Sequence, residues 1–332
     1  MTIAVVILNW NGIELLKKFL PSVIEFSPEA TVYVADNAST DASVNYLKEN
    51  FPGVEIIRNK VNGGFAKGYN DALAFLKEDV FILLNSDVMV TPHWLLPITD
   101  IFKKDLKTGA VQPKILDYKN PEFFEYAGAA GGFLDRLGYP YCRGRIFETV
   151  EKDLGQYDDE LEIFWASGAC MAIKREAFYQ VGAFDEDYFA HQEEIDICWR
   201  LKNFGYTVKF TASSVVFHVG GATLNYVNPR KTFYNFRNSL YNLIKNLPTS
   251  TLLWVFPLRM ILDGIAAIKF LLEGKGDHFH AIFKAHLNFY KMLPVMLKKR
   301  RDLPRKKFKF DPFSVVFYHY LLGNRKSSKF KG

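Results

Sequence analysis

The first half of the chain alternates short apolar runs with segments of helical spacing. Four apolar runs are too short for typical helices and predict buried strands: residues 3–8, 31–35, 54–58 and 80–84. Between them, apolar residues recur with helical spacing over 14–24 and over about 66–77. Strands and helices that alternate in this way form βαβ units. We therefore expect an α/β fold built on a mainly parallel sheet with helices on its faces.

Polar residues follow each predicted strand at once. The carboxyl ends of parallel strands lie at one edge of a sheet, so this edge should gather Asn9, Asp36, Asn62 and Asp87. Open α/β sheets bind their ligands at this edge. It is therefore where we expect the functional site.

The motif Asn85-Ser86-Asp87 has two interpretations. Its amide and carboxylate could hold a divalent cation whose remaining ligands are phosphate oxygens. Alternatively, the three residues form a polar turn before a helix that starts near Thr91, since Asn, Ser and Asp are favoured in turns. The motif alone leaves both interpretations open.

The motif Asn62-Gly63-Gly64 is open in the same way. Its glycines could let the backbone approach a diphosphate at the start of a helix, or they could form an ordinary tight turn. The stretch matches neither the Gly-x-Gly-x-x-Gly fingerprint nor the Walker pattern. This argues against an enzyme that uses a nicotinamide cofactor or hydrolyses ATP.

The pattern loosens between residues 116 and 161 and sharpens again at 164–173. In the first segment we expect irregular loops and short strands that cover the sheet edge. The second segment predicts a strand of small residues, which a ligand could approach closely. A short helix that ends at Gly182 should follow it.

A further helix is predicted to carry Glu193 and Glu194 in its first turn. Asp196 and Arg200 lie four residues apart and can pair along this helix. Carboxylates in a first turn often do no more than complement the helix dipole. Alternatively, one glutamate faces the sheet edge as a general base, kept ionised by that dipole and by any nearby cation.

The chain changes character from about residue 249. Its apolar segments between 252 and 272 are interrupted by charged side chains and fall short of a membrane span. They could lie in a membrane interface as one or two amphipathic helices, with the basic clusters 298–309 and 325–331 against anionic lipid. The alternative is a helical subdomain or a dimer interface with a solvated basic tail. The aromatic residues of the tail follow an apolar helical pattern, which argues against nucleic-acid binding.

Composition supports a large folded core. With 332 residues, 49% of them hydrophobic, and a net charge of +6, the chain is long enough for one α/β domain over 1–245 and a helical, basic region over 246–332. The three cysteines lie far apart without a Cys-x-x-Cys pair, which indicates neither a zinc knuckle nor a disulfide framework. A reducing cytosol fits best, and the opening residues predict a first strand rather than a signal peptide.

The motifs, taken in this order, resemble the inverting, nucleotide-sugar-dependent glycosyltransferases of family 2. The likeness is strongest to the rhamnosyltransferase-like branch, which builds bacterial surface polysaccharides. It covers roughly residues 2–243, and the stretches that carry it are 6–12, 34–41, 62–66, 83–87, 182–186 and 193–200. The resemblance implies a GT-A fold, which is a Rossmann-like, mainly parallel sheet flanked by helices, here with a C-terminal helical appendage.

The resemblance also implies a role for each motif. The residues implied as nucleotide contacts are Asn9, Asn11, Asp36, Asn62, Gly63, Gly64, Asn85 and Arg237. The first three would hold the nucleobase and the ribose. Arg237 suits a diphosphate because its planar fork bonds two oxygens, but anchoring the loop that carries His218 is equally consistent with its position.

A divalent cation, Mg²⁺ or Mn²⁺, is implied at Asp87, with His218 completing the metal or diphosphate site. Asn85 stands where the family has aspartate, and a neutral amide binds such cations less strongly than a carboxylate does. A lone histidine is also often no more than a structural hydrogen-bonding group, so both roles of His218 stay open.

The catalytic pair of the family falls on Glu193 and Glu194, with Glu194 in the position usually assigned the base. The implied reaction moves a sugar from a UDP- or dTDP-sugar to a hydroxyl of a glycan or lipid-linked acceptor, with inversion. Its implied place is the cytoplasmic face of the cell membrane, and a homo-oligomer is compatible with this interpretation. The alternative is a non-catalytic nucleotide-sugar binder or envelope-assembly scaffold, because fold alone does not establish chemistry.

Overall fold

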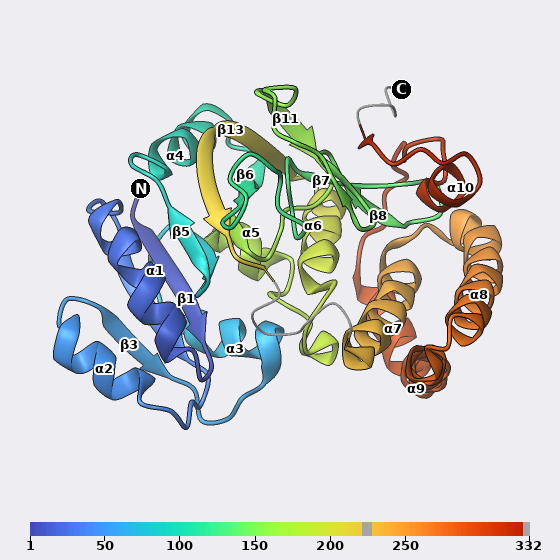
Figure 1. The fold of residues 1–332 in the computed structure, drawn as a ribbon, viewed down its shortest axis with the longest axis horizontal. Coiled ribbons are helices and arrows are strands. Elements are labelled where there is room, and N and C mark those ends of the chain that lie inside the picture. Colours follow the sequence, from blue (N-terminus) through green and yellow to red (C-terminus); the bar gives the residue numbers. More distant parts are fainter. Residues whose placement is uncertain (221–227, 328–332) are drawn as a thin grey trace.

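The computed structural model describes residues 1–220 and 228–327 (Figure 1). The strands of its main sheet are β1 (Ile3–Asn9), β2 (Thr31–Asp36), β3 (Glu55–Arg58), β4 (Val80–Asn85), β5 (Val88–Val90), β6 (Thr108–Asp117), β11 (Glu160–Ile163), β12 (Cys170–Lys174) and β13 (Thr207–His218). In the described part of the chain these nine strands follow the order β11-β13-β6-β12-β4-β1-β2-β3, with β5 paired to β13.

The four strands predicted in the first half are confirmed as the parallel half of this sheet. β1 pairs in parallel with β2 and β4, and β2 pairs in parallel with β3. The other half is mixed, because β12 runs antiparallel to both β4 and β6, while β13 is parallel to β6. Apolar runs predict where strands form but not their direction, so the antiparallel pairing of β12 could not be predicted from the sequence pattern.

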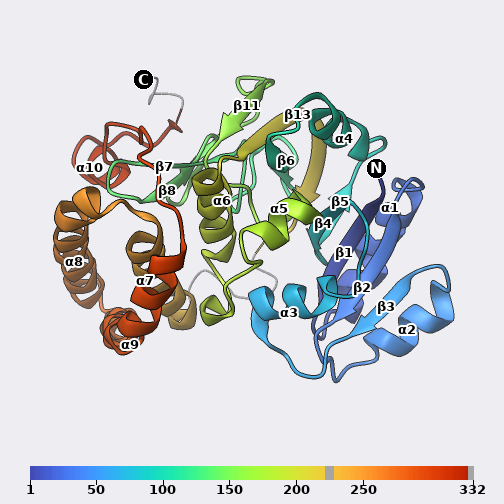
Figure 2. The same ribbon diagram turned by 180° about the vertical axis from the view of Figure 1, so that it is seen from behind.

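Helices cover both faces of the sheet (Figures 1 and 2). The helices of this domain are α1 (Ile13–Glu25), α2 (Ser43–Asn50), α3 (Gly64–Leu73), α4 (Leu95–Lys104), α5 (Arg175–Gln180) and α6 (Glu193–Phe204), with a 3-10 turn at Glu186–Tyr188. Alternation along β1 separates two apolar layers. Val5 joins the layer of α1, α2 and α4, and Val6 joins the layer of α3, α5 and α6.

Three predicted boundaries were wrong. The strand predicted at 164–173 begins only at Cys170, because the small residues before it form a turn in which the Ser167 N–H donates to Gln112 Oε1 at 2.8 Å. The helix predicted over 66–77 spans Gly64–Leu73, and the helix expected near Thr91 begins at Leu95.

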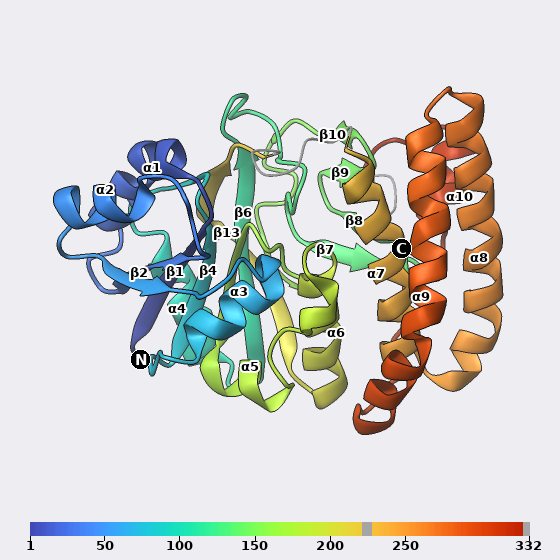
Figure 3. The same cartoon turned by 90° about the horizontal axis from the view of Figure 1, so that it is seen from below.

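The segment between β6 and β11 consists of loops and short strands, as expected. Its four-stranded sheet has the order β10-β9-β8-β7. The strands are β7 (Gly132–Leu134), β8 (Pro140–Cys142), β9 (Arg145–Ile146) and β10 (Thr149–Val150). This small sheet lies between the main sheet and the C-terminal helices (Figure 3).

The C-terminal part is helical, and its helices are α7 (Pro229–Asn246), α8 (Thr249–Leu272), α9 (Gly276–Asp302) and α10 (Val315–Tyr320). Figure 3 shows α7, α8 and α9 side by side at the end of the molecule opposite α1 and α2. Phe289 and Met296 of α9 join the same apolar core as α6 and β12. Within residues 1–220 and 228–327, no helix combines the length and the apolar character that crossing a membrane requires.

Candidate functional site

The strand ends of the parallel half form one polar edge. Asn9 ends β1 and Asp36 ends β2, and both side chains are fully buried. Asn9 Nδ2 lies 3.5 Å from Asp36 Oδ1 and 3.2 Å from Ser39 Oγ. Asn11 Oδ1 accepts hydrogen bonds from the backbone N–H groups of Thr40 and Asp41, at 2.7 and 3.2 Å. The loops after β1 and β2 are therefore fixed to each other.

The Asn62-Gly63-Gly64 turn packs against the segment before α6. Asn62 Oδ1 accepts from the Gly64 N–H at 3.0 Å, and the Phe65 N–H donates to the carbonyl of Phe189 at 2.7 Å. Gly64 has φ +79°, and a Cβ there would lie 2.4 Å from the Phe189 carbonyl oxygen. Glycine is therefore required at position 64 by this close approach, whether or not the turn also contacts a ligand.

Asp87 and His218 lie together at the same edge. His218 is the last residue of β13 and pairs with Val88 of β5, which brings His218 Nε2 within 3.1 Å of Asp87 Oδ1. Asn85 Nδ2 lies 3.4 Å from the same ring nitrogen. The two residues expected at the cation are thus neighbours, although 131 positions separate them in the sequence.

Glu125 was missed by the sequence analysis and completes this cluster. It is 3% exposed, and its Oε2 lies 3.2 Å from His218 Nδ1. Burial alone would lower the pKa of His218, but the charges and hydrogen bonds of Glu125 and Asp87 outweigh it and raise this pKa to about 10. Glu125 lies in a loop without local pattern, so no signal in the sequence marked it.

This cluster fits a divalent cation only in part. Asp87 offers carboxylate oxygens, and His218 offers Nε2 once its proton has left. In the described ranges, no three histidine, cysteine or acidic side chains are arranged as a complete metal site. A cation here would therefore need further ligands, such as the phosphate oxygens of a substrate.

The turn before α6 is held in an unusual backbone conformation. Phe189, His191 and Gln192 have φ values of 64°, 68° and 72°, a region that non-glycine residues seldom adopt. Asn238 Nδ2 donates to the carbonyl of His191 at 2.7 Å, and Arg237 Nη2 donates to the carbonyl of Asp187 at 2.9 Å. Such strain persists where the surroundings over-determine it, and it is common at active sites.

The hydrogen bonds of Arg237 show which segment its side chain holds in place. In one of the two interpretations of the sequence, Arg237 anchors the loop that carries His218. Among the described residues, its guanidinium instead bonds the Asp187–Tyr188 carbonyls and Asn288 Oδ1. Gly221 to Thr223, which belong to the motif around His218, lie outside the described residues, as do the last residues of the basic cluster 325–331.

Glu193 and Glu194 begin α6, as predicted, and both are short of partners. Glu193 is 4% exposed and Glu194 is half-buried, and Oε2 of each is buried with no hydrogen-bond partner in the described structure. Burial raises the pKa of Glu194 to about 7, although backbone N–H donors oppose the shift. Burial and the charge of Glu194 raise the pKa of Glu193 well above its ordinary value.

The helix dipole was expected to keep the base ionised, but it does not have the dominant effect on the pKa of Glu194. The N–H groups of the first turn do lower the pKa of Glu194, but loss of water around the carboxylate has the larger effect. A carboxyl with a pKa near 7 can both accept and release a proton near neutral pH. This is the property that a general base requires.

Two cations near Glu125 and Tyr126 were also missed. The Arg145 guanidinium lies 4.5 Å from the centre of the Tyr126 ring, and Lys231 Nζ lies 5.4 Å from the same ring. Arg145 also donates to Cys142 Sγ, and the charges of both Glu125 and Glu194 act on that thiol. These side chains come from β8, β9, α7 and the loop after β6, so only the tertiary fold brings them together.

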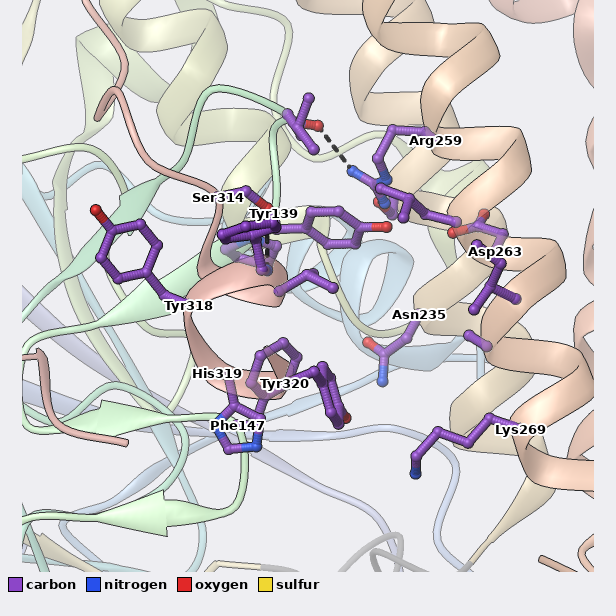
Figure 4. A pocket seen from close by; sticks show the side chains of 18 of the residues that line it. Tyr139, Phe147, Asn235, Arg259, Asp263, Lys269, Ser314, Tyr318, His319 and Tyr320 are labelled. Carbon is purple, nitrogen blue, oxygen red and sulfur yellow. Dashed lines mark hydrogen bonds between the residues drawn. The ribbon is translucent and has the colours of Figure 1, made fainter. Parts of the chain in front are cut away.

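A large cavity of about 1540 Å³ adjoins this cluster. Tyr126 and Gln192, the residue before Glu193, line it, and most of the remaining wall comes from the small sheet, α7, α8 and the segment that contains α10 (Figure 4). Pockets for drug-sized ligands measure roughly 300–1,000 Å³. The cavity is therefore large enough for more than one sugar unit.

Comparisons with known proteins bear on the family and the fold. N-acetylglucosaminyl-diphospho-decaprenol L-rhamnosyltransferase of Mycobacterium tuberculosis is 29% identical over 222 residues, which are 61% of this chain and 71% of the relative. The solved structure of GalNAc-T7 with UDP, GalNAc and Mn²⁺ has a TM-score of 0.58 at 18% identity over 75% of this chain. The chain spans only 48% of that protein.

A second solved structure covers almost the whole chain. Residues 1–349 of TarS from S. aureus, in complex with UDP-GlcNAc, have a TM-score of 0.56 at 14% identity, over 93% of this chain and 94% of that one. These likenesses confirm the expected GT-A fold. The family model described as glycosyl transferase family 2 matches residues 4–182, more than half of the chain. The chain therefore belongs to glycosyl transferase family 2.

Proposed function

We propose that this glycosyltransferase moves a sugar from a nucleotide-diphosphate donor to a hydroxyl of a lipid-linked or glycan acceptor, with inversion, in bacterial surface polysaccharide synthesis. The observation that carries the proposal is the pair Glu193–Glu194. The Oε2 atom of each is buried without a hydrogen-bond partner in the described structure, and Gln192, the residue before them, lines the large cavity. A relative at 29% identity is named for rhamnosyl transfer to a diphospho-decaprenol acceptor, which supports this choice.

Glu194 is the proposed general base. Its carboxylate takes the proton of the acceptor hydroxyl while that oxygen forms a bond to the anomeric carbon of the donor sugar. The bond from this carbon to the diphosphate breaks in the same step, and the nucleoside diphosphate leaves with its electron pair. A single displacement inverts the configuration, and a pKa of about 7 suits Glu194 to this task at neutral pH.

The polar sheet edge is the proposed donor site. Asn9, Asn11 and Asp36 would bind the nucleobase and ribose of a UDP- or dTDP-sugar. The further proposed contacts are Asn62, Gly63, Gly64 and Asn85. Arg237 is better supported as a positioning residue, since its hydrogen bonds reach the turn before α6.

A divalent cation, Mg²⁺ or Mn²⁺, is proposed at Asp87, with His218 beside it. When bound, such a cation stabilises the negative charge of the departing diphosphate. The 3.1 Å approach of His218 Nε2 to Asp87 Oδ1 supports a shared role, and Glu125 orients the ring from its other nitrogen. GalNAc-T7, which shares the fold, was solved with Mn²⁺ together with UDP, and this agrees with the proposal.

Peripheral contact with an anionic membrane is proposed for α8 and α10. Apolar side chains of α8 that face solvent include Leu253 at 74% exposure, Ile261 at 61% and Ile268 at 56%. Exposed lysines lie along the adjacent α9, and such charges near an anionic surface contribute roughly 1 kcal/mol each. A cytoplasmic membrane face is where a lipid-linked acceptor would be presented to this enzyme.

Co-sedimentation with vesicles of phosphatidylcholine, with and without phosphatidylglycerol, tests the membrane contact. We expect binding that grows with the anionic lipid and falls at least fivefold in the double variant Ile261→Asp, Ile268→Asp. Equal binding of the variant, or a concentration-dependent dimer in analytical ultracentrifugation that the variant abolishes, would overturn it in favour of a dimer interface.

The donor and the cation are tested by calorimetry on the full chain with UDP-, dTDP- and GDP-sugars, with and without Mn²⁺ or Mg²⁺. We expect one donor to bind tightly and the cation to strengthen that binding. Asp87→Ala should remove the effect of the cation. Donor binding without any sugar transfer to isolated lipid-linked acceptors would instead favour the scaffold alternative.

A further inference from the structure

The cavity that Gln192 lines has both polar and apolar walls. Polar residues of the lining include Gln192, Asn235 and Ser239. Apolar residues of α8 and the C-terminal segment also wall it: Trp254, Leu258, Leu262, Ile265, Phe313, Val316 and Phe317. Several of these remain open to solvent, such as Ile265 at 57% and Phe317 at 50% exposure. The apolar side is thus continuous with the surface proposed to face the membrane.

The α8 wall of the cavity holds buried charges with unused hydrogen-bonding capacity. Arg259 is 2% exposed, and its guanidinium lies 3.6 Å from the centre of the Tyr139 ring and donates to the carbonyl of Leu137. Arg259 Nε and Asp263 Oδ1 have no hydrogen-bond partner in the described structure. Figure 4 shows both residues on α8 at the cavity wall, near Tyr139.

Positive charge prevails around the cavity. Its described lining includes five cationic side chains against three carboxylates: Arg136, Arg259, Lys269, Lys275 and Arg325 against Glu148, Asp263 and Glu273. Lys269 and Lys275 both pair with Glu273. Lys269 Nζ lies 5.6 Å from the centre of the Tyr320 ring, and Figure 4 shows both side chains at the cavity. A ligand that suits this lining has an anionic part beside these cationic side chains and an apolar part that leaves between α8 and α10.

We infer that this cavity binds the lipid diphosphate of the acceptor. The acceptor sugar lies at Tyr126 and Gln192, its diphosphate lies among the cationic side chains, and its isoprenoid-type chain lies between α8 and α10 toward the membrane. This inference rests on the proposed function, and it assigns to the C-terminal helices a direct part in substrate selection. The cavity volume, which exceeds that of pockets for drug-sized ligands, accommodates such an extended molecule.

Farnesyl diphosphate, which carries a short isoprenoid chain on a diphosphate, is the probe for a binding experiment with the full chain. Ala266 lines the cavity and Ile268 lies on the same helix outside its lining. We expect calorimetry to show saturable binding to the unchanged protein, at least tenfold weaker binding to Ala266→Trp, and unchanged binding to Ile268→Trp. Leu258 lines the cavity about two helical turns before Ala266. Leu258→Trp should therefore weaken binding as Ala266→Trp does.

Two shorter probes separate the parts of the ligand. Inorganic pyrophosphate should compete weakly, and farnesol should bind less tightly than farnesyl diphosphate, because each supplies only one part. Absence of farnesyl diphosphate binding, or equal binding to Ala266→Trp and to the unchanged protein, would overturn the inference. Circular dichroism of each variant shows whether it has folded.

The binding experiment tests the lipid-diphosphate site separately from the proposed transfer of a sugar. If farnesyl diphosphate binds and Ala266→Trp weakens it, but no sugar is transferred, the proposed function fails while the lipid-diphosphate site stands. If sugar is transferred to a lipid-linked acceptor with a KM that Ala266→Trp leaves within twofold, the proposed function stands and the site is wrong. Donor binding should be the same in every variant, since the donor residues lie at the sheet edge.

Discussion

Two carboxyl groups of helix α6, those of Asp196 and Glu194, have pKa values shifted in opposite directions. Asp196 is fully buried and meets Arg200 Nε at 2.8 Å, Lys245 Nζ at 2.9 Å and Asn246 Nδ2 at 3.0 Å. Burial alone would raise the pKa of Asp196, but Arg200 and Lys245 hold it below its ordinary value. Two residues earlier, Glu194 has no cationic partner in the described structure, and its pKa rises to about 7.

The difference separates a carboxylate that supports the fold from one available for chemistry. Removing one partner of a buried ion pair is strongly destabilising, because the other charge is then buried without compensation. A buried carboxyl without such partners is unfavourable for stability, and perturbed groups of this kind gather at functional sites. The first turn of α6 is thus anchored at Asp196 and left reactive at Glu194.

The largest expected effect comes from removing the reactive carboxyl. Glu194→Gln should lower kcat by about 10²–10⁴-fold, because the acceptor hydroxyl loses its base. Thermal unfolding should be unchanged or occur at a slightly higher temperature, since an uncharged amide replaces an unpaired buried carboxyl. Glu193→Gln is the matched control. Normal turnover in Glu194→Gln together with loss of turnover in Glu193→Gln would move the base to Glu193.

Removing a partner of the anchored carboxylate should have the next largest effect. Lys245 is 2% exposed and pairs with both Asp196 and Asp185, so Lys245→Met leaves two buried carboxylates with fewer cations. We expect a loss of about 3–5 kcal/mol in the free energy of unfolding, measured in urea. Lys299→Met, at a position 35% exposed, should cost about 1 kcal/mol or less. Equal losses in the two variants would contradict the distinction.

The pH dependence of the rate probes the reactive carboxyl directly. A base must be ionised, so kcat/KM should fall about tenfold per pH unit below the pKa of Glu194, near 7, and level off above it. Glu193→Gln should leave the midpoint in place. Loss of water around the carboxylate, and not the charge of Glu193, raises the pKa of Glu194. A midpoint near 4.5 would show that Glu194 is not desolvated during turnover.

The smallest expected effect tests how the reactive turn is held. Arg237→Met should lower kcat by about tenfold by loosening the Asp187–Tyr188 turn, while the donor dissociation constant changes less than twofold. If Arg237 contacts the diphosphate, calorimetry will instead show much weaker donor binding. The ratio of the two effects separates positioning from binding.

The sequence was sufficient for the parallel half of the sheet and for α6. There the apolar runs are short, the helices follow helical spacing, and the polar residues fall at the strand ends. The Asp196–Arg200 pair was also predictable, because four residues on a helix fix the distance between two side chains.

The partners that arise only in the tertiary fold could not be predicted. Glu125 reaches His218 from a loop without pattern, and Lys245 reaches Asp196 from a different helix. The cavity is walled by segments more than 100 residues apart, such as those that carry Tyr126 and Lys269. Spacing along the chain carries no information about such contacts.

The salt bridges of α9 have a practical consequence for recombinant fragments. Lys299 pairs with Asp185 and Asp187, in the turn that leads to the glutamates, and Arg300 Nη1 donates to the carbonyls of Ile244 and Leu247. A fragment trimmed after α7 would retain every matched motif and Lys245, yet lose Lys299, the second cation at Asp185 and the one that pairs with Asp187. A minimal active fragment should therefore extend through Arg300, well beyond the last recognisable motif.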